Sequence, residues 1–151
     1  MKTILIVLIC LTCMPGCKKE DNAPAGPTST FDRASISGRW RLTHYHDIAT
    51  NTKISEPPEI SRSIVLDFID KGDSGTFSGH TITNKVLGTY VLGVNQKITV
   101  LKFGGTKAGE SHNWGHDFWT AIRASNSYKA SNSRLFIYYD NSARMLEFVS
   151  D

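Results

Sequence analysis

The histidines His112 and His116 have the spacing that comes nearest to a catalytic metal site. Four residues apart on a helix, two imidazoles lie on one face, as zinc sites require. Glu110 is close by, and His44 and His46 would be available to complete such a site. However, His112 is expected to precede the helix, and asparagine follows it where a metalloprotease signature has glutamate. We therefore predict no metal ligand and no cofactor, and rank a metal-dependent enzyme third among the functions considered.

Other patterns that would carry catalysis are incomplete. The glycine-rich segment 104–109 contains a lysine but lacks the Gly-Lys-Ser/Thr that enters a helix in phosphate-binding loops. Residues 78–80 read Ser-Gly-His, which is not the Gly-x-Ser-x-Gly of a nucleophile elbow. Asp117 is interpreted as a helix-dipole partner, and Asp67 as part of the solvent face of a strand. We expect no catalytic residues and predict that the protein is not an enzyme.

The strongest chemical signal is at Cys17. Lys2, an apolar run over residues 4–11 and small residues before a cut site predict a secretory signal. The run is too short to span a bilayer, which needs about 20 apolar residues. Gly16-Cys17 resembles the end of a lipobox, the recognition site of lipoprotein signal peptidase, which implies cleavage after residue 16 and acylation of Cys17. The abrupt polarity change at residues 18–21 would place the thiol at the membrane interface; ordinary secretion with a free Cys17 is the alternative.

The charged residues 18–21 (Lys-Lys-Glu-Asp) also resemble the export signals of some Gram-negative surface lipoproteins. We therefore expect a lipid anchor in the outer membrane of a bacterial cell envelope, with the protein facing either the periplasm or the cell surface. Of the three cysteines, Cys10 and Cys13 leave with the signal peptide, so the mature body has no disulfide.

Composition divides the chain into three parts. Residues 1–16 form the predicted signal peptide, and residues 17–33 form the acylated cysteine and a flexible tether rich in Pro, Ala, Gly, Ser and Thr. Residues 34–151 have the length of one domain. Lys2 is the only charged residue of the signal peptide, so its removal lowers the formal charge from +3 to +2. Basic residues are scattered rather than striped, and we expect no nucleic-acid partner.

The body is dominated by short segments that alternate apolar and polar residues, with turn residues between them. Period-two alternation indicates half-buried strands. In the first, Trp40 and Leu42 are expected on the inner face, and His44 continues the same alternation. Residues 51–58, which contain two prolines, are expected to form a loop. Strands are predicted at residues 38–46, 63–68, 76–80, 86–93, 97–103, 127–130, 134–139 and 144–149.

The pattern changes to helical spacing only once, over residues 113–124. Trp114, Phe118 and Ile122 recur on one face, and Asn113 is a suitable N-cap. Five strands, a helix and three strands with short links predict a mostly β fold, with an antiparallel curled sheet or barrel of about eight strands and one helix.

The order of these elements resembles the META domain of HslJ-type heat-inducible lipoproteins. The matching residues form a Gly-x-Trp-x-Leu opening strand, a glycine with a short link to asparagine, and a Gly-x-Tyr; they are Gly38, Trp40, Leu42, Gly79, Asn84, Gly88 and Tyr90. The resemblance implies structural roles for these residues, a barrel, and a non-enzymatic role in stress tolerance or binding at the envelope. Thr83 stands where many members have a cysteine, so no cysteine-dependent property is carried over.

A lipocalin-like barrel, which also begins with Gly-x-Trp, is the alternative resemblance and implies a small apolar ligand. Trp119 lies off the apolar stripe of the helix, and one of Tyr138 and Tyr139 must face outward from its strand. These three rings are the predicted contact surface for an unknown protein or small-molecule ligand.

Overall fold

The computed structural model describes residues 34–151. The predicted signal peptide, Cys17 and the tether lie outside the described residues. In order, the elements are β1 (Gly38–Asp47), β2 (Thr52–Ser55), β3 (Val65–Asp70), β4 (Ser74–His80), β5 (Lys85–Leu92), the 3-10 turn η1 (Val94–Gln96), β6 (Ile98–Gly105), α1 (Asn113–Arg123), β7 (Ser125–Ala130), β8 (Arg134–Tyr139) and β9 (Arg144–Ser150).

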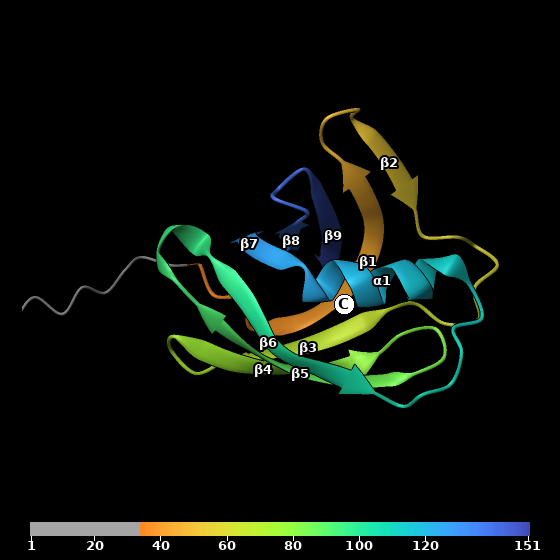
Figure 1. Cartoon of the computed structure of the whole chain (residues 1–151), viewed down its shortest axis with the longest axis horizontal. Coiled ribbons are helices and arrows are strands. Elements are labelled where there is room, and N and C mark those ends of the chain that lie inside the picture. Colours follow the sequence, from red (N-terminus) through yellow and green to blue (C-terminus); the bar gives the residue numbers. More distant parts are fainter. Residues whose placement is uncertain (1–33) are drawn as a thin grey trace, which may run out of the picture.

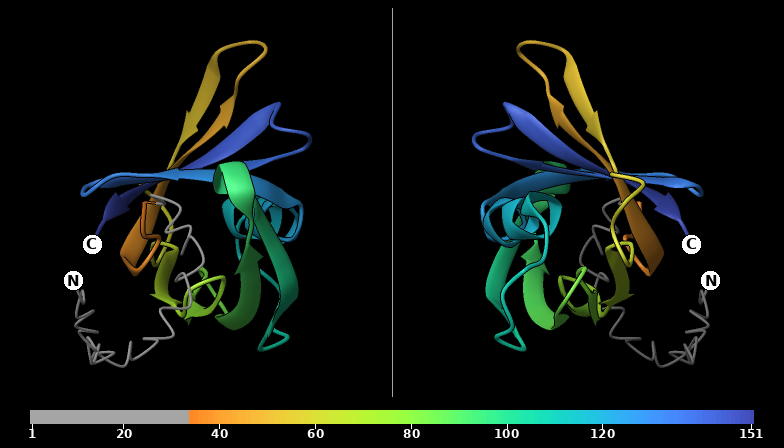
Figure 2. Two further views of the ribbon diagram at one scale, coloured as in Figure 1. Left: turned by 90° about the vertical axis from the view of Figure 1, so that its left-hand side faces the viewer. Right: turned by 90° about the vertical axis from the view of Figure 1, so that its right-hand side faces the viewer.

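The strands form one antiparallel sheet that curls into a nearly closed barrel (Figure 1). The strand order is β6-β5-β4-β3-β1-β9-β8-β7, and β2 extends the far end of β1 as a hairpin. A single bridge joins Lys97, the residue just before β6, to Ser127 of β7, at the two ends of the sheet. Helix α1 connects these same two strands, and Figure 2 shows it beside the gap between them, with the β1–β2 hairpin projecting beyond the barrel. The predicted fold class is confirmed.

The barrel is filled by its inward-facing apolar side chains. One cluster includes Leu42, Leu66 and Phe148, which are fully buried, together with the aromatic rings of Phe68 and Phe77, whose centroids are 5.1 Å apart. The helix contributes Trp114, Phe118, Ala121 and Ile122, the stripe that its spacing predicted. Since a fully buried large apolar side chain contributes about 1.5–3 kcal/mol, this cluster is the main source of stability.

The inner face of β1 changes register part-way along the strand. Trp40 and Leu42 are buried as predicted, but a β-bulge between Leu42 and His44 shifts the pairing with β9. A bulge inserts one extra residue, which moves the following side chains to the opposite face. Tyr45 therefore enters the core with 7% exposure, and the prediction that His44 lies on the inner face is wrong.

Two local predictions differ from the structure. Residues 52–55, expected in a loop, form β2 and pair with β1 from His44 to Asp47. All four β2 residues are exposed, so the segment carries no alternating apolar pattern that would have revealed it. The helix has His112 rather than Asn113 as its N-cap: the backbone N–H of Trp114 donates to His112 Nδ1 at 3.0 Å.

Most of the motif residues behind the META resemblance lie at points of close packing. A Cβ on Gly88 would be 2.3 Å from Phe77 Cζ, and one on Gly79, where φ is +159°, would be 2.0 Å from a backbone oxygen of β3. The Tyr90 hydroxyl donates to Asp70 Oδ1 at 2.8 Å at one end of the barrel. Glycine is required at positions 79 and 88 because the strands approach closely there. Tyr90 is required for the hydrogen bond that its hydroxyl makes.

Within residues 34–151, no helix has the length and apolar character needed to cross a bilayer.

Candidate functional site

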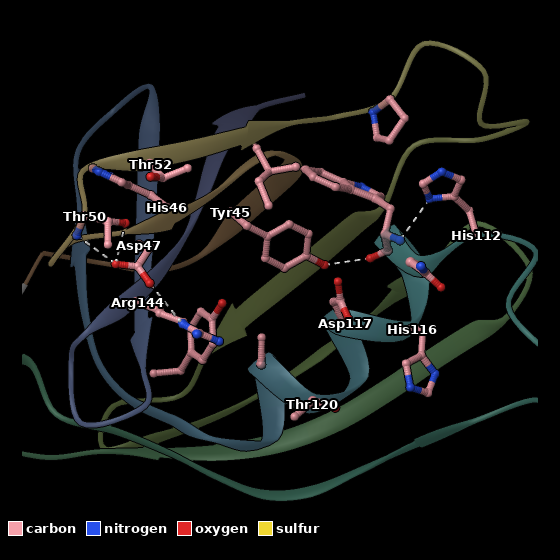
Figure 3. Close-up of a pocket in the computed structure, with 16 residues that line it drawn as sticks. Tyr45, His46, Asp47, Thr50, Thr52, His112, His116, Asp117, Thr120 and Arg144 are labelled. Carbon is pink, nitrogen blue, oxygen red and sulfur yellow. Dashed lines mark hydrogen bonds and ion pairs between the residues drawn. The ribbon is translucent and has the colours of Figure 1, made fainter.

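A pocket of about 670 Å³ lies between the β1–β2 hairpin, the first turns of α1 and the adjoining ends of β8 and β9 (Figure 3). Its walls come from segments far apart in the chain, since β1 precedes β9 by about a hundred residues. The lining combines aromatic rings, hydroxyls, imidazoles and charged groups. It includes Tyr45, His46, Asp47, Thr50, Thr52, Ile54, His112, Trp114, His116, Asp117, Thr120, Tyr139 and Arg144.

The inner wall of the pocket is a fixed aromatic pair. The ring centroids of Tyr45 and Trp114 are 4.5 Å apart and nearly perpendicular, at 80°. The Tyr45 hydroxyl donates to the backbone oxygen of Trp114 at 2.7 Å, which ties β1 to the start of the helix. Burial, followed by the nearby negative charge of Asp117, raises the pKa of the Tyr45 phenol. Tyr45 therefore stays protonated and acts as a rigid hydrogen-bonded wall.

Trp114 has a buried hydrogen-bond donor without a partner. The residue is 3% exposed, and its Nε1–H is buried without a hydrogen-bond partner in the described structure. A buried donor left unpaired costs about 1–3 kcal/mol. Trp40 differs, because its Nε1–H donates to the backbone oxygen of Ile36 at 2.9 Å.

Some charged side chains in and around the pocket form ion pairs, and one does not. The Arg144 guanidinium lies between two carboxylates, with its Nε 3.5 Å from Asp47 Oδ2 and 3.8 Å from Asp140 Oδ2. Asp47 also accepts hydrogen bonds from the Thr50 N–H and hydroxyl, and these, with Arg144, hold its pKa below the usual value. The side chain of Asp117, on the helix, is exposed and makes no hydrogen bond or ion pair within residues 34–151. Figure 3 shows its carboxyl group directed toward the Tyr45 hydroxyl.

Tyr139 occupies the β8 side of the pocket and is half-buried. Burial raises the pKa of its phenol; Arg144 opposes that increase, while Asp117 reinforces it. The influence of Asp117 on both tyrosines places its carboxylate within electrostatic range of Tyr45 and Tyr139.

The histidines do not assemble into a metal centre. His112 caps the helix and its Nε2 is 3.6 Å from a Glu59 carboxylate oxygen, whereas His116 is exposed. Figure 3 shows the two rings on different sides of the start of α1. His46 is on the hairpin, with its Nε2 3.1 Å from Asn51 Oδ1. Among residues 34–151, no three His, Cys, Asp or Glu side chains are grouped to hold a metal ion.

Glu110 positions the helix that forms one side of the pocket. Its Oε1 accepts hydrogen bonds from Thr81 Oγ1 at 2.5 Å, from Asn84 Nδ2 at 2.8 Å and from Trp119 Nε1 at 2.8 Å. Its Oε2 accepts one from the backbone N–H of Thr83 at 3.3 Å. Burial acts to raise the pKa of Glu110, but these hydrogen bonds outweigh it and leave the pKa lowered. Asn84, 1% exposed, also binds the chain before the helix through Ala108 and Thr106.

The three rings predicted as a contact surface have different surroundings in the structure. Trp119 is not the exposed ring that was expected: it is partly buried, hydrogen-bonded to Glu110 and 4.7 Å from the Phe103 ring. Tyr139 lines the pocket, and Tyr138 is partly buried on the same strand. The pocket residues Tyr45, Asp47 and Trp114 were not predicted together, since no sequence motif joins β1 to α1.

The fold and the site define the class of the domain: a nearly closed antiparallel β-barrel with one helix and a pocket at the hairpin end. No protein-family model matches the chain, and no curated protein matches it significantly.

Solved structures share this barrel. A DUF4847 family protein from Bacteroides vulgatus is 14% identical with a TM-score of 0.57, covering 76% of this chain and 93% of that one. A protein from Burkholderia xenovorans, solved by NMR, is 18% identical with a TM-score of 0.60, covering 76% of this chain and 82% of that one. At these identities the likeness establishes the fold alone. The comparisons support the barrel, and none of them assigns the chain to the META family that the sequence resembles.

Proposed function

We propose that the protein is an outer-membrane lipoprotein, anchored through acyl chains on Cys17 and facing the periplasm or the cell surface, whose barrel binds a small molecule without transforming it. The observation that carries the binding role is the pocket of about 670 Å³, which falls within the range of about 300–1,000 Å³ typical of ligand sites. The non-enzymatic part rests on the sequence, where no catalytic motif is complete, and on the META/HslJ-like resemblance, which also suggests a role in stress tolerance.

The lipocalin-like alternative implies an apolar ligand in the interior of the barrel. A lipocalin holds its ligand inside the barrel, but here Leu42, Leu66 and Phe148 are among the buried side chains that fill that space. The pocket lies instead between the hairpin and the helix, where the lining is both apolar and polar. A ligand in this site therefore needs polar groups as well as apolar surface.

Anchoring is tested by metabolic labelling with radioactive palmitate. Wild-type protein should be labelled and recovered with membranes, whereas Cys17→Ala should be unlabelled and soluble. Stable attachment requires more than one acyl chain, which the several chains of a mature lipoprotein supply. Equal labelling of both proteins would refute acylation at Cys17.

Ligand binding is tested by blocking the pocket. Thr120 lines the pocket and is exposed, so Thr120→Trp fills the space without opening the core. Thr99→Trp places the same ring on an exposed position of β6 outside the pocket and serves as the matched control. Native mass spectrometry of the protein from its own cells should show a bound small molecule on wild type and Thr99→Trp but not on Thr120→Trp. Absence of a bound molecule from all three proteins would argue against the proposal.

A further inference from the structure

The outer surface of strands β3 to β6, here called the β3–β6 face, is an open sheet face. Side chains alternate along a strand, and Val86 and Tyr90 point into the barrel, so Leu87 of β5 points outward. Leu87 pairs with Ser78 of β4 and Gly104 of β6. Neither neighbour is large enough to cover it, and Leu87 is 63% exposed.

Exposed aliphatic side chains are concentrated on this half of the barrel. Within residues 34–151, six large hydrophobic side chains are exposed, and four of them belong to β3, β5, β6 or the link between β5 and β6: Ile69, Leu87, Val94 and Leu101. The other two, Ile48 and Ile54, belong to the β1–β2 hairpin, which Figure 1 shows on the far side of the barrel from β4 and β5. Exposed apolar side chains bordered by polar ones mark contact sites for membranes or proteins.

Positive charge is concentrated on the same half. Residues 71–109 have five lysines and one acidic residue, a net charge of +4. The other described residues, 34–70 and 110–151, have eight basic and ten acidic residues, a net charge of −2. Among the lysines of residues 34–151, ion pairs are confined to Lys53, so the five lysines of this half are available to an external anion.

The five lysines border the exposed leucines of β5 and β6. Lys71 and Lys97 lie in the β3–β4 and β5–β6 links, which are at the same end of the antiparallel sheet. Lys85 begins β5 and Lys107 follows β6, at the opposite end, and Lys102 lies between them on β6. Long lysine side chains place their ammonium groups in water or among headgroups while their stems cover apolar surface.

The described chain enters the barrel at the edge of this face. The Ser35 hydroxyl donates to Asp70 Oδ2 at 3.1 Å, next to Lys71. Sixteen residues, 18–33, separate this entry from Cys17, the predicted anchor. A chain of that length reaches at most about 55 Å. Acyl chains on Cys17 would therefore keep the face near a bilayer, where a weak contact gains from the high local concentration.

We propose that the β3–β6 face is a docking surface for a membrane that carries anionic phospholipids. The lysine ammonium groups contact the lipid phosphates, and the exposed leucines enter the boundary between headgroups and acyl chains. Both charge attraction and burial of aliphatic side chains strengthen such a contact. It is separate from the small-molecule pocket and from acylation, and it leaves the β1–β2 hairpin directed away from the lipid.

The test measures sedimentation of the full-length Cys17→Ala chain, which cannot be acylated at residue 17, with two kinds of lipid vesicle. One kind is pure phosphatidylcholine, and the other is an equimolar mixture of phosphatidylcholine and phosphatidylglycerol. The chain should bind the anionic vesicles about tenfold or more tightly than the neutral ones. Added salt should reduce this difference, because it screens exposed charges.

Matched variants in the same background locate the contact. Lys102→Glu should weaken binding to anionic vesicles by about fivefold or more, and Lys102→Arg should preserve it. Lys129→Glu makes the same charge change at an exposed position of β7 and should have little effect. Leu87→Ser should weaken binding, whereas Ile54→Ser, at a position that is 61% exposed on the hairpin, should not. All variants share residues 1–33, so differences between them report on the barrel.

Equal binding of the Cys17→Ala chain to the two kinds of vesicle would overturn the proposal. Equal weakening by Lys102→Glu and Lys129→Glu would also overturn it, since the vesicles would then respond only to net charge. Loss of binding in Lys102→Glu but not in Leu87→Ser would indicate a dissolved polyanion, such as nucleic acid or an acidic polysaccharide, and would contradict the lipid assignment. None of these outcomes alters the palmitate labelling of Cys17 or the pocket test with Thr120→Trp.

Discussion

Replacing Glu110 with glutamine should destabilise the barrel through a single side chain. In the wild type, one carboxylate oxygen accepts three hydrogen bonds, from Thr81, Asn84 and Trp119. The second oxygen accepts the backbone N–H of Thr83. In Glu110→Gln the charge is lost, and the amide group must direct its NH2 toward either the N–H of Thr83 or the three donors. One set of donors therefore loses its acceptor.

The expected loss follows from the kinds of hydrogen bond involved. Hydrogen bonds to a charged group contribute about 1.5–3 kcal/mol each and neutral ones about 0.5–1.5 kcal/mol. Because Thr81 and Asn84 each have a second partner, the three weakened bonds are not additive. We expect the free energy of unfolding to fall by about 2–4 kcal/mol. For a domain of this size that corresponds to a decrease in Tm of about 8–16 °C.

The assay is thermal and urea unfolding of Glu110→Gln and of Glu59→Gln, at pH values from 3 to 7. Glu59 is the control, since its side chain is 66% exposed and its contact with His112 is 3.6 Å. The pKa of Glu110 is lowered in the folded state, so its contribution is complete above about 4.5, the ordinary value, and is lost as the pH falls through the folded pKa.

The stability gap between wild type and Glu110→Gln should therefore be largest near neutral pH and should narrow at acidic pH. Glu147, whose pKa is also lowered, is present in both proteins and cancels from the difference. A gap that is independent of pH, or no larger than that of Glu59→Gln, would refute this account of Glu110.

Three further predictions concern the packing, the cap and the pocket. Gly88→Ala should lower the free energy of unfolding by about 1–3 kcal/mol because its Cβ meets the Phe77 ring, whereas Gly104→Ala, with no atom within 4 Å, should not; urea unfolding tests both. His112→Ala should cost about 1 kcal/mol by removing the acceptor for the Trp114 N–H, and an equal loss in the exposed His116→Ala would contradict this. Asp117→Asn should lower the pKa of Tyr139, seen as phenolate absorbance appearing at lower pH, and an unchanged titration would place Asp117 too far away.

Alternating residues predicted the strands because burial on one face leaves a direct imprint on the sequence. Ile64, Leu66 and Phe68 recur with period two and are all buried, and Phe118 and Ile122 recur at helical spacing and are fully buried. Short polar links between such segments require antiparallel neighbours, which is why the barrel with one helix was predictable.

Features that lack this imprint were not predicted. β2 is exposed at all four residues, so its pairing with β1 leaves no apolar pattern. The bulge after Leu42 places Tyr45, instead of His44, on the inner face of β1. This bulge can be recognised only from the pairing of β1 with β9. Trp119 was expected to be exposed because it lies off the apolar face of the helix. The Glu110 carboxylate and the Phe103 ring cover it in the structure, and its position on the helix does not indicate either contact.

The amino-acid sequence by itself determined the class of fold, since the period of its apolar residues reports which faces are buried. It also predicts the acylation of Cys17, which depends on a local recognition pattern near the N-terminus. Only the tertiary structure decided which polar groups meet at the pocket. Tyr45, Trp114 and Asp117 come together because β1 and α1 pack across a separation of about seventy residues, and no local pattern records such a contact.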